Sequence, residues 1–421
     1  MHDTAAFEFS VRILPENRSF LLNAGLESVV RHLEDVRITE AEFEDMDRSG
    51  RYSSEVMNYL RAFRFTGDVW AMPEGTIFFA GEPVIRIVAP LPQAQLLETR
   101  IINLLHIQIL LASKAVRCVL AAKGRANLID FGVRRAHGAE AGIFAARASY
   151  VAGFAGTSTV LAEPLYGIPV FGTMAHSFIE AHGDEHTAFL DFARANPGAV
   201  TLLIDTYDTL RGAVRAVDTA RKLEKEGIKV GGVRLDSGDI ATLSKKVRKI
   251  LDEAGLRDVR IFASGNMDEY SVRDLLAQGA PIDGFGIGTK LDTSADAPYL
   301  DCAYKLMEYG GKARFKKSEG KETWPGRKQV YRSFRDGIMT EDCIALETDA
   351  AEGIPLLQPV MAGGKRVCDL PDLAEIRSRV ERELKSLPAY LRGLEPSTRY
   401  PVQIAPALQA LRDNAAAEFD R

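Results

Sequence analysis

The sequence predicts an α/β protein, in which an incomplete TIM-like α/β barrel is accompanied by a second α+β domain built from both chain ends. From Gly124 onward, short apolar strands alternate with helices, and several strand starts lie about 30 residues apart. Polar and charged residues follow each of these strands where it ends. Outside this region the alternation is lost. We therefore assign residues 124–297 to the barrel, and residues 1–123 together with 298–421 to the discontinuous second domain.

The composition excludes several classes of protein. The chain has 421 residues, of which 46% are hydrophobic and 26% charged, and its formal net charge is −5. Such a chain has no broad positive field, so we expect no nucleic acid as a partner and only a small phosphate-bearing ligand. Polar residues interrupt the apolar stretch 101–122, which argues for a buried helix and against a membrane partner. The four scattered cysteines indicate reduced thiols and a cytoplasmic location.

The two chain ends carry a mixed pattern of strands and helices. In order, the expected elements before the barrel are a strand at 7–12, helices at 24–33 and 53–63, a hairpin at 76–88 and a long helix at 93–123. The hairpin is expected to turn at Gly81-Glu82-Pro83. Beyond Pro298 the pattern returns to strands, and two helices are expected after Pro371.

Six strands are expected in the central region, at 126–131, 169–172, 200–205, 232–235, 259–263 and 282–287. Two arrangements of such βα units are open. In a barrel, the carboxyl ends of all strands converge on one mouth. In a doubly wound sheet, the functional residues gather at one switch point instead. Because every strand is followed by polar residues, we favour the barrel, and six strands make it incomplete.

Glycine-rich turns after the last two strands predict a phosphate site. Gly286, Gly288 and Thr289 follow one strand, where main-chain N–H groups and a hydroxyl can approach a phosphate. The alternative is a tight turn that closes a βα unit. The preceding strand delivers Ser264, Gly265 and Asn266, which we assign to the same phosphate-binding set.

Arg234 and Asp236 lie two residues apart at a strand end, so their side chains point to the same side. The guanidinium suits a carboxylate or phosphate, and the carboxylate suits a ribose diol or a bound Mg²⁺. The alternative is a structural ion pair. Phe131 and Arg134 follow the first barrel strand, where a ring face beside a guanidinium suits a flat anionic heterocycle.

Three histidines occur close together, but their spacing is not that of a metal site. His182 and His186 form an i, i+4 pair without the intervening Glu of the metalloprotease pattern, which favours a polar helix face over a metal site. His176 lies nearest the expected barrel mouth. It is a candidate base, phosphate donor or phosphoryl acceptor.

Taken together, these segments resemble nicotinate phosphoribosyltransferases over almost the whole chain. The runs that carry the resemblance, in the order in which the family has them, are Ala6-Phe7-Glu8-Phe9, Ala24-Gly25-Leu26-Glu27, Ile129-Asp130-Phe131-Gly132-Val133-Arg134-Arg135, Gly156-Thr157-Ser158-Thr159-Val160, Gly172-Thr173-Met174-Ala175-His176-Ser177, Leu203-Ile204-Asp205-Thr206-Tyr207-Asp208-Thr209, Gly232-Val233-Arg234-Leu235-Asp236-Ser237-Gly238-Asp239, Gly286-Ile287-Gly288-Thr289 and Pro325-Gly326-Arg327-Lys328-Gln329-Val330.

The resemblance implies a type II phosphoribosyltransferase fold and a homodimer with a shared active site. The implied reaction joins nicotinate to 5-phosphoribosyl 1-diphosphate, with ATP hydrolysis, and gives nicotinate mononucleotide and diphosphate for NAD salvage. Mg²⁺ is expected to be carried by the diphosphate and ATP, with no direct protein site. The resemblance implies that Thr173 and Arg234 contact nicotinate, that Thr289 contacts the phosphoribosyl phosphate, and that His176 is autophosphorylated. With Asp236 as a second catalytic residue, the expected nicotinate site is Phe131, Arg134, Ser158, Thr173 and Arg234.

Ser158 bears on the choice of substrate. The related nicotinamide enzyme has an Asp at the matching position, where it would accept a hydrogen bond from an amide and repel a carboxylate. The neutral Ser158 fits an acid substrate. The family also begins with an additional helix whose Asp-Leu-Tyr motif supplies a Tyr that stacks on nicotinate across the dimer. This chain opens downstream of that motif, at Met1-His2-Asp3, so reduced activity is an expectation of the sequence.

Three rival functions remain. A quinolinate phosphoribosyltransferase would need a denser cluster of Arg and Lys for its dicarboxylate substrate. A barrel aldolase or isomerase would offer a Lys or Glu at a strand end, where this chain has Asp, Arg and His. A catalytically silent protein that binds phosphoribosyl ligands is the alternative from a different class.

Overall fold

The computed structural model describes residues 3–198, 200–316, 318 and 322–419, and the chain divides into two compact units. Unit 1 contains the residues up to Ser113 and from Tyr299 onward, and unit 2 is Lys114–Pro298. The fold is mixed α/β, with a parallel sheet in unit 2 and a separate strand-rich unit 1. Met1 and His2, where the chain opens, lie outside the described residues.

Unit 1 contains most of the strands. Its strands are β1 (Thr4–Ile13), β2 (Leu21–Leu22), β3 (Asp68–Ala71), β4 (Ile77–Phe78), β5 (Pro83–Pro90), β12 (Asp301–Tyr309), β13 (Lys312–Ala313), β14 (Lys328–Arg335), β15 (Ile338–Leu346), β16 (Ile354–Pro355), β17 (Gln358–Ala362), β18 (Lys365–Arg366) and β19 (Val402–Ile404). Its helices are α1 (Leu26–Asp35), α2 (Glu40–Ser49), α3 (Ser54–Arg61), α4 (Leu91–Leu96), α14 (Leu373–Ser386), η2 (Ala389–Leu391) and α15 (Pro406–Phe419). Helix α5 (Glu98–Ala122) begins in unit 1 and ends in unit 2.

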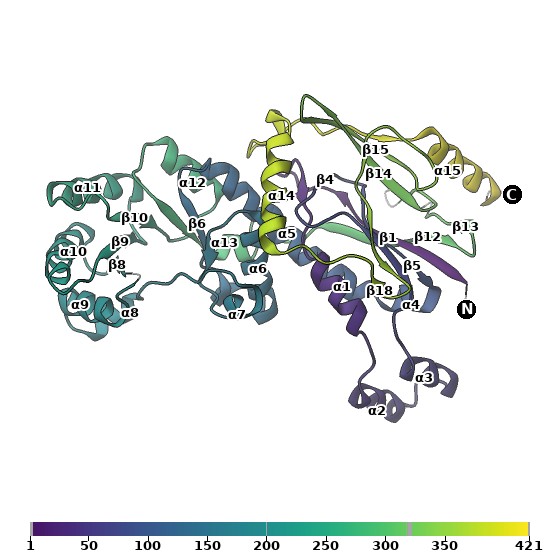
Figure 1. Ribbon diagram of the computed structural model, residues 1–421, viewed down its shortest axis with the longest axis horizontal. Coiled ribbons are helices and arrows are strands. Elements are labelled where there is room, and N and C mark those ends of the chain that lie inside the picture. Colours follow the sequence, from purple (N-terminus) through teal and green to yellow (C-terminus); the bar gives the residue numbers. More distant parts are fainter. Residues whose placement is uncertain (1–2, 199, 317, 319–321, 420–421) are drawn as a thin grey trace. The chain divides into compact units, whose positions relative to one another are not determined.

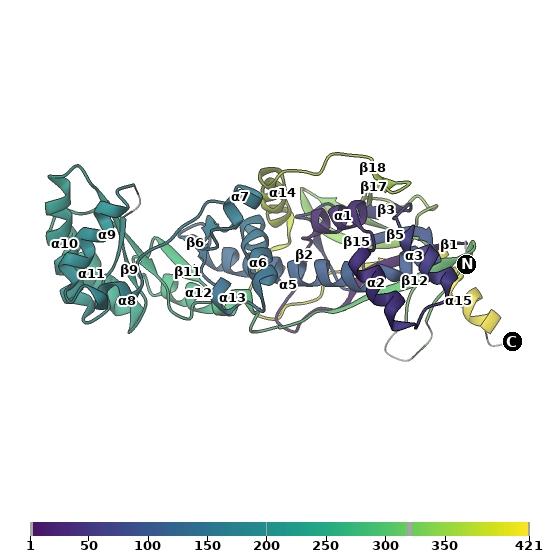
Figure 2. The same cartoon turned by 90° about the horizontal axis from the view of Figure 1, so that it is seen from below.

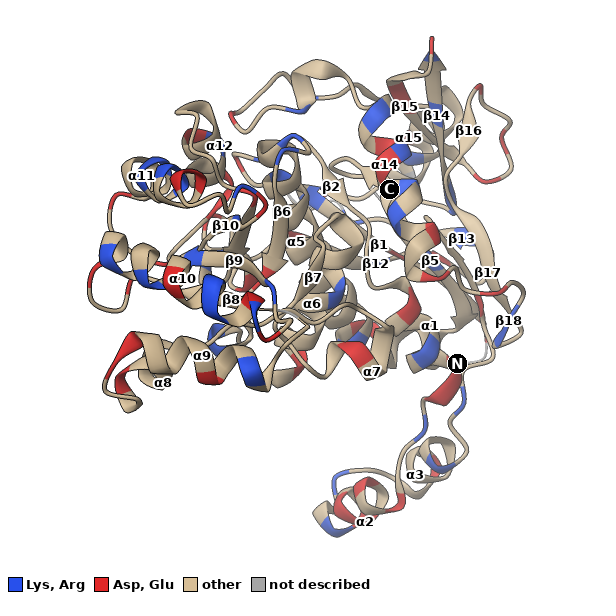
Figure 3. Ribbon diagram, turned by 60° about the vertical axis from the view of Figure 1, so that its left-hand side comes forward, with Lys and Arg blue, Asp and Glu red and all other residues tan. Residues whose placement is uncertain are grey.

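Strand β1 lies inside a seven-stranded sheet whose order is β13-β12-β1-β5-β3-β17-β18 (Figure 2). Its residues Ala5, Ala6, Phe7 and Phe9 are buried on both faces of the strand, which explains the continuous apolar run. A second sheet has the order β16-β14-β15-β19. Helices α2 and α3 stand away from these sheets (Figures 1 and 3), and α2 has no buried residue.

The hairpin expected at 76–88 is wrong. Ile77 and Phe78 form β4, which pairs with β2, whereas β5 pairs with β1 and β3. Alternation identifies a strand but not its partner, and here the partners are distant in sequence. The turn between the two strands is closed by the buried carboxylate of Glu82, which accepts a hydrogen bond from the main-chain N–H of Phe79 at 2.9 Å.

The long helix expected at 93–123 is confirmed except for a break at Leu97, between α4 and α5. Helix α5 is long and apolar enough to cross a membrane by length and composition alone. However, 78% of its most apolar 18-residue window is buried within the protein. That burial is typical of a core helix.

Unit 2 is built on six parallel strands in the order β7-β6-β11-β10-β9-β8, with helices α9, α10 and α11 beside β8, β9 and β10 (Figure 1). Charged residues of both signs are distributed over these helices (Figure 3). The strands are β6 (Asn127–Asp130), β7 (Gly156–Thr157), β8 (Val200–Leu203), β9 (Val230–Leu235), β10 (Arg260–Ala263) and β11 (Gly284–Ile287). The helices are η1 (Val133–Arg135), α6 (Ala139–Ala152), α7 (Ala162–Tyr166), α8 (His176–Ala181), α9 (Glu185–Ala195), α10 (Thr209–Glu224), α11 (Ile240–Glu253), α12 (Glu269–Ala277) and α13 (Thr289–Asp292).

Five of the six strands expected in this region are confirmed, and the strand expected at 169–172 is wrong. Val170 makes only an isolated bridge to Thr157, and the edge strand β7 is supplied by Gly156 and Thr157. Pro169 has no main-chain N–H, which prevents a longer ladder there. Its carbonyl instead accepts a hydrogen bond from the N–H of Thr157 at 3.1 Å.

A buried charged cluster joins strands β14 and β15 of unit 1 to helix α14. The guanidinium of Arg332 is fully buried and donates to both carboxylate oxygens of Asp342, with the shortest contact at 2.6 Å. Glu383 of α14 accepts a further hydrogen bond from Arg332 at 3.1 Å, and the Tyr400 hydroxyl lies 3.1 Å from Asp342. Each member therefore has a partner, which is the condition under which buried charges are tolerated.

Replacing Asp342 with Ala is expected to lower the free energy of unfolding by about 3–5 kcal/mol, because it leaves the buried Arg332 guanidinium without its main partner. Asp45→Ala is the matched control, since Asp45 pairs with Arg48 on the exposed surface of α2. The control is expected to change stability by less than about 1 kcal/mol. Chemical denaturation monitored by circular dichroism measures both values. Equal losses in the two variants would contradict the importance of the buried cluster.

Candidate active site

Three neighbouring strands of unit 2 deliver a hydrogen-bonded network centred on Arg234. The residue lies on β9, and its side chain is 13% exposed. Its guanidinium donates to Asp236 and Ser264, both at 3.2 Å, and to the main-chain oxygen of Met174 at 3.0 Å. The Ser264 hydroxyl, after β10, donates to the same carboxylate oxygen of Asp236. Burial lowers the pKa of Arg234, and the charge of Asp236 acts in the opposite direction.

Asp205, which follows β8, fixes the position of Asp236. Its carboxylate accepts hydrogen bonds from the main-chain N–H of Asp236 at 2.8 Å and from the Ser237 hydroxyl at 2.7 Å. The loop after β9 is thereby tied to the end of β8. Asp205 was not among the predicted site residues, although its place directly after a strand is a signal that could have identified it.

His176, at the start of α8, lies beside this network. Its Nδ1 is 3.1 Å from the Thr206 hydroxyl, and its Nε2 is 3.9 Å from the Asp236 carboxylate. The imidazole is 40% exposed, so it is accessible to a ligand. His182 and His186 are engaged elsewhere, with the main-chain oxygen of Phe178 and the hydroxyl of Thr219. His182 is the C-cap of α8 and His186 lies in α9, so the single polar helix face expected for this pair is wrong.

A small pocket of about 50 Å³ opens beside the network. Phe131, Thr173 and Arg234 line it, together with Phe171 and Gly286. Three of the five residues expected to contact nicotinate therefore border one cavity. Gly286 permits this arrangement, because a Cβ at that position would lie 2.5 Å from the Phe131 ring.

The residues expected to bind phosphate lie in the turns after β10 and β11, except for Gly286, which lies on β11 itself. Gly265 has φ +91°, and a Cβ there would lie 2.0 Å from the main-chain oxygen of Asp236. Asn266, which follows it, also has positive φ. In the other turn, Thr289 begins α13, and its hydroxyl accepts a hydrogen bond from Arg135 at 3.0 Å. Gly288 passes so close to the Phe131 carbonyl that a Cβ would lie 2.8 Å from it.

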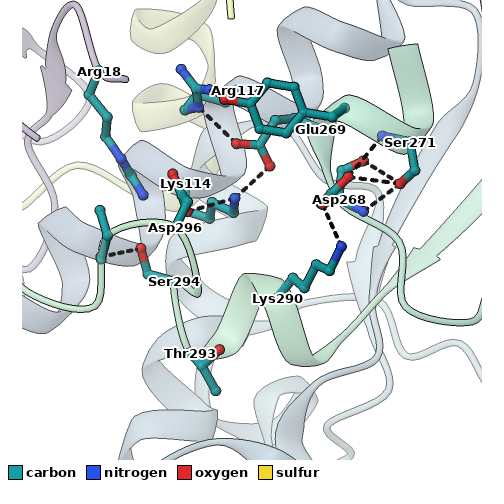
Figure 4. Close-up of polar contacts among 12 residues, drawn as sticks. Arg18, Lys114, Arg117, Asp268, Glu269, Ser271, Lys290, Thr293, Ser294 and Asp296 are labelled. Carbon is teal, nitrogen blue, oxygen red and sulfur yellow. Dashed lines mark hydrogen bonds and ion pairs between the residues drawn. The ribbon is translucent and has the colours of Figure 1, made fainter. Parts of the chain in front are cut away.

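Ion pairs at the start of α12 connect these two turns to each other and to α5 (Figure 4). The fully buried carboxylate of Glu269 accepts from Lys114 at 2.5 Å and from Arg117 at 2.9 Å, so the start of α12 is held against α5. The preceding residue, Asp268, caps α12 and accepts from Lys290 of α13 at 2.7 Å. The turn after β10 and the turn after β11 are therefore linked to each other.

Arg134 and Ser158, which were also predicted to contact nicotinate, do not line this pocket. The side chain of Arg134 is exposed, yet its charge lies close enough to lower the pKa of Arg234 further. Ser158 donates its main-chain N–H to the Asp130 carbonyl at 2.7 Å, and it is not one of the residues that line the pocket. Four residues absent from the prediction take part in the site, namely Asp205, Thr206, Arg135 and Lys290. Asp205 and Thr206 follow a strand and Arg135 is adjacent to a predicted residue, but no sequence signal marked Lys290.

Family models match most of the chain. The model described as nicotinate phosphoribosyltransferase (NAPRTase) family matches residues 126–325. The corresponding N-terminal and C-terminal domain models match residues 1–106 and 347–412. These matches cover both units.

Individual relatives match over similar lengths. A nicotinate phosphoribosyltransferase of Mycobacterium tuberculosis is 48% identical over 407 residues, which cover 96% of this chain and 87% of the relative. One of Bos taurus is 31% identical, over 99% of this chain and 93% of the relative. One of Bacillus subtilis is 42% identical, over 78% of this chain and 68% of the relative.

Solved structures are similar throughout the chain. The crystal structure of human nicotinic acid phosphoribosyltransferase matches with a TM-score of 0.88 at 29% identity, over 98% of this chain and 96% of the human one. That of nicotinate-nucleotide pyrophosphorylase from Pyrococcus furiosus matches with a TM-score of 0.74 at 28% identity, over 91% of this chain and 90% of the other. Sequence and fold agree over nearly the full length, and the chain belongs to the nicotinate phosphoribosyltransferase family.

Proposed function

We propose that this protein joins nicotinate to 5-phosphoribosyl 1-diphosphate, with ATP hydrolysis, and so forms nicotinate mononucleotide and diphosphate for NAD salvage. The observation that carries the proposal is the pocket lined by Phe131, Thr173 and Arg234, in a chain that belongs to this family over nearly its full length. A catalytically silent protein is not favoured, because the polar network around Arg234 and Asp236 is intact.

Arg234 suits the carboxylate of nicotinate. Its Nη atoms are occupied by protein acceptors, but its buried Nε has no hydrogen-bond partner among the described residues. A ligand carboxylate in the adjacent pocket would satisfy this donor, and an unsatisfied buried donor costs about 1–3 kcal/mol. The ring of Phe131 offers a face for the pyridine. We assign neutral Ser158 and the nearby charge of Arg134 to the same preference for an acid.

The transfer step needs positioned charges more than a protein nucleophile. The pyridine nitrogen attacks the anomeric carbon as the bond to the diphosphate oxygen breaks, so positive charge develops on the ribose and negative charge on the leaving group. Asp236 is the carboxylate assigned to the ribose side. Ser264, Gly265 and Asn266 after β10 are assigned to phosphate, together with Gly286 on β11 and Gly288 and Thr289 directly after it. The link between these turns through Asp268 and Lys290 supports a common role.

Mg²⁺ and ATP complete the proposed reaction. Among the described residues, no three His, Cys, Asp or Glu side chains converge as a metal site. The proposed Mg²⁺ ion is held by the oxygens of the diphosphate and of ATP, since Mg²⁺ is commonly bound through substrate phosphates. When bound, the ion would neutralise charge on the leaving diphosphate.

His176 is the proposed phosphoryl acceptor. If Nδ1 carries the proton and donates it to Thr206, Nε2 has a free lone pair. Attack of Nε2 on the γ-phosphorus of ATP would form the N–P bond, break the P–O bond to ADP and release one proton from the imidazole. The new phosphoryl charge would lie beside Asp236, 3.9 Å from Nε2, and could order nearby cations or loops.

Three further assignments belong to this proposal. We infer that the open six-stranded sheet is an incomplete form of a TIM-like barrel, since its strands deliver polar residues at their carboxyl ends. We infer a homodimer with a shared active site and a cytoplasmic location. The burial of α5 and the four free cysteines support the location.

The direct test is mass-spectrometric detection of nicotinate mononucleotide. Product is expected from nicotinate and 5-phosphoribosyl 1-diphosphate with Mg²⁺, and more of it with ATP. Nicotinamide and quinolinate are expected to react poorly, because neither matches a site that is neutral at Ser158 and binds one carboxylate. A preference for either of these compounds would reassign the substrate. Binding of the sugar diphosphate without any product would favour the silent alternative.

Replacing His176 with Ala is expected to abolish the stimulation by ATP while leaving an ATP-independent rate. His182→Ala is the matched control, because His182 is on the same short segment but outside the network. Initial rates measured with and without ATP separate the two variants. Equal stimulation of wild type and His176→Ala would exclude His176 as the phosphoryl acceptor.

Replacing Arg234 with Lys is expected to raise the KM for nicotinate roughly 10- to 100-fold, the equivalent of one charge-assisted hydrogen bond. A lysine has no donor at the Nε position, and it lacks the planar fork that suits a carboxylate. Arg211→Lys on the exposed surface of α10 is the control. Steady-state kinetics at saturating 5-phosphoribosyl 1-diphosphate measure the change. An unaltered KM for nicotinate would show that the carboxylate binds elsewhere.

A further inference from the structure

Two buried carboxyl groups lie against each other beneath the proposed phosphate turn. Asp130, the last residue of β6, is fully buried, and Asp292, the last residue of α13, is 2% exposed. Gly132 donates its main-chain N–H to Asp130 at 2.8 Å and also packs directly against the carboxyl group of Asp292, so the two side chains adjoin the same residue. Neither the transfer reaction nor the binding of substrate uses them directly.

Asp130 has the contacts of an ionised carboxylate. One oxygen accepts the main-chain N–H of Gly132 at 2.8 Å, and the other accepts the hydroxyl of Thr157 at 2.6 Å. Because both oxygens act as acceptors, this carboxyl has no need of a proton of its own.

Asp292, by contrast, lacks the hydrogen-bond donors that an ionised carboxylate needs. Among the described residues, no donor reaches either of its carboxyl oxygens. The group is packed tightly against Gly132, where a Cβ would lie 2.1 Å from the Cγ of Asp292. An ionised carboxylate in this place would be buried without a donor, beside a second negative charge.

Among the described residues, no basic side chain hydrogen-bonds to Asp292 to compensate a second charge. Helix α13 packs against η1 and α6, whose charged residues are Arg134, Arg135, Glu140 and Arg147. Arg135 donates to Thr289, and Arg147 lies over the ring of Tyr166. The causes that raise the pKa of Asp292, to about 10, are burial and then Asp130, and no basic side chain is among them. Burial also raises the pKa of Asp130, against the hydrogen bonds from Thr157 and Gly132.

We propose that Asp292 is a neutral carboxylic acid that donates its proton to the carboxylate of Asp130, and that this hydrogen bond positions the phosphate turn on the end of β6. Asp292 lies one helical turn after Thr289, and Asp130 directly precedes Phe131. The shared proton therefore joins the turn assigned to phosphate with the ring assigned to nicotinate. Asp292 is a positioning residue, and this part of the inference rests on the proposed function.

The two carboxyl groups are expected to respond differently to the same substitution. In Asp292→Asn, the amide N–H₂ replaces the O–H donor, so the KM for 5-phosphoribosyl 1-diphosphate is expected to stay within about twofold of wild type. In Asp292→Ala the hydrogen bond is lost, and this KM is expected to rise about tenfold. In Asp130→Asn, the amide cannot accept from both Gly132 and Thr157, so a lower melting temperature is expected. Equal effects of Asp292→Asn and Asp292→Ala on this KM, or full tolerance of Asp130→Asn, would overturn the proposal.

Two measurements do not depend on activity. Infrared spectra of the wild-type protein at neutral pH are expected to contain a C=O band of a protonated carboxyl that is missing from Asp292→Asn. Since the folded protein holds a proton that the unfolded chain releases, wild-type stability should fall as pH rises from the ordinary value of 3.8 towards about 10. Asp292→Asn is expected to lose this component of the pH dependence.

The outcomes separate the two proposals. A protonated band in an inactive protein would support the shared proton and contradict the proposed function. An active protein without the band would support the proposed function and contradict the shared proton. If Mg²⁺ without substrates raises the melting temperature of wild type but not of Asp292→Asn, the two carboxyl groups bind metal, and the shared proton is wrong.

Discussion

The charge of Arg234 is held where its side chain is only 13% exposed, and the arrangement of the candidate site follows from that constraint. A buried guanidinium is tolerated only if its donors are satisfied and an opposite charge is close. Asp236 supplies the charge, and Ser264 and the carbonyl of Met174 supply further acceptors. Asp236 follows β9, Ser264 follows β10, and Met174 lies in the loop before α8. The parallel sheet must therefore be in register before Arg234 has a stable place.

The same constraint explains why glycines recur at the strand ends. The backbone after one strand must pass very close to a group that is delivered by its neighbour. A Cβ on Gly265 would overlap the carbonyl of Asp236, and one on Gly286 would overlap the ring of Phe131. These glycines bring the turns close enough for side chains from separate strands to form one site. Flexibility as such is not required of them.

Local pattern predicted five of the six expected strands of unit 2 and part of the site, because Arg234 lies near the end of β9, and Asp236 and Ser264 directly follow β9 and β10. Arg234, Asp236 and Ser264 were identified in this way, and they form one network. The pairing of strands could not be predicted from alternation, as the error at 76–88 shows. The role of Asp292 could not be predicted from the sequence, because a carboxyl group near the end of a short helix is usually exposed. Its burial depends on the close approach of Gly132, which only the structure shows.

Unit 2 buries carboxyl groups in two physically different ways, and the difference follows from what is near them. Asp236 has the guanidinium of Arg234 within 3.2 Å, so its negative charge is matched inside the protein. In the described part of the chain, no basic side chain pairs with Asp130 or Asp292, and one proton between them takes the place of a counter-charge. A guanidinium beneath the phosphate turn would compete with the ligand's own cations and with Lys290, whereas a shared proton adds no net charge beyond that of one carboxylate. The shared proton therefore supports the turn after β11 without placing a further positive charge beside the groups that we assign to phosphate.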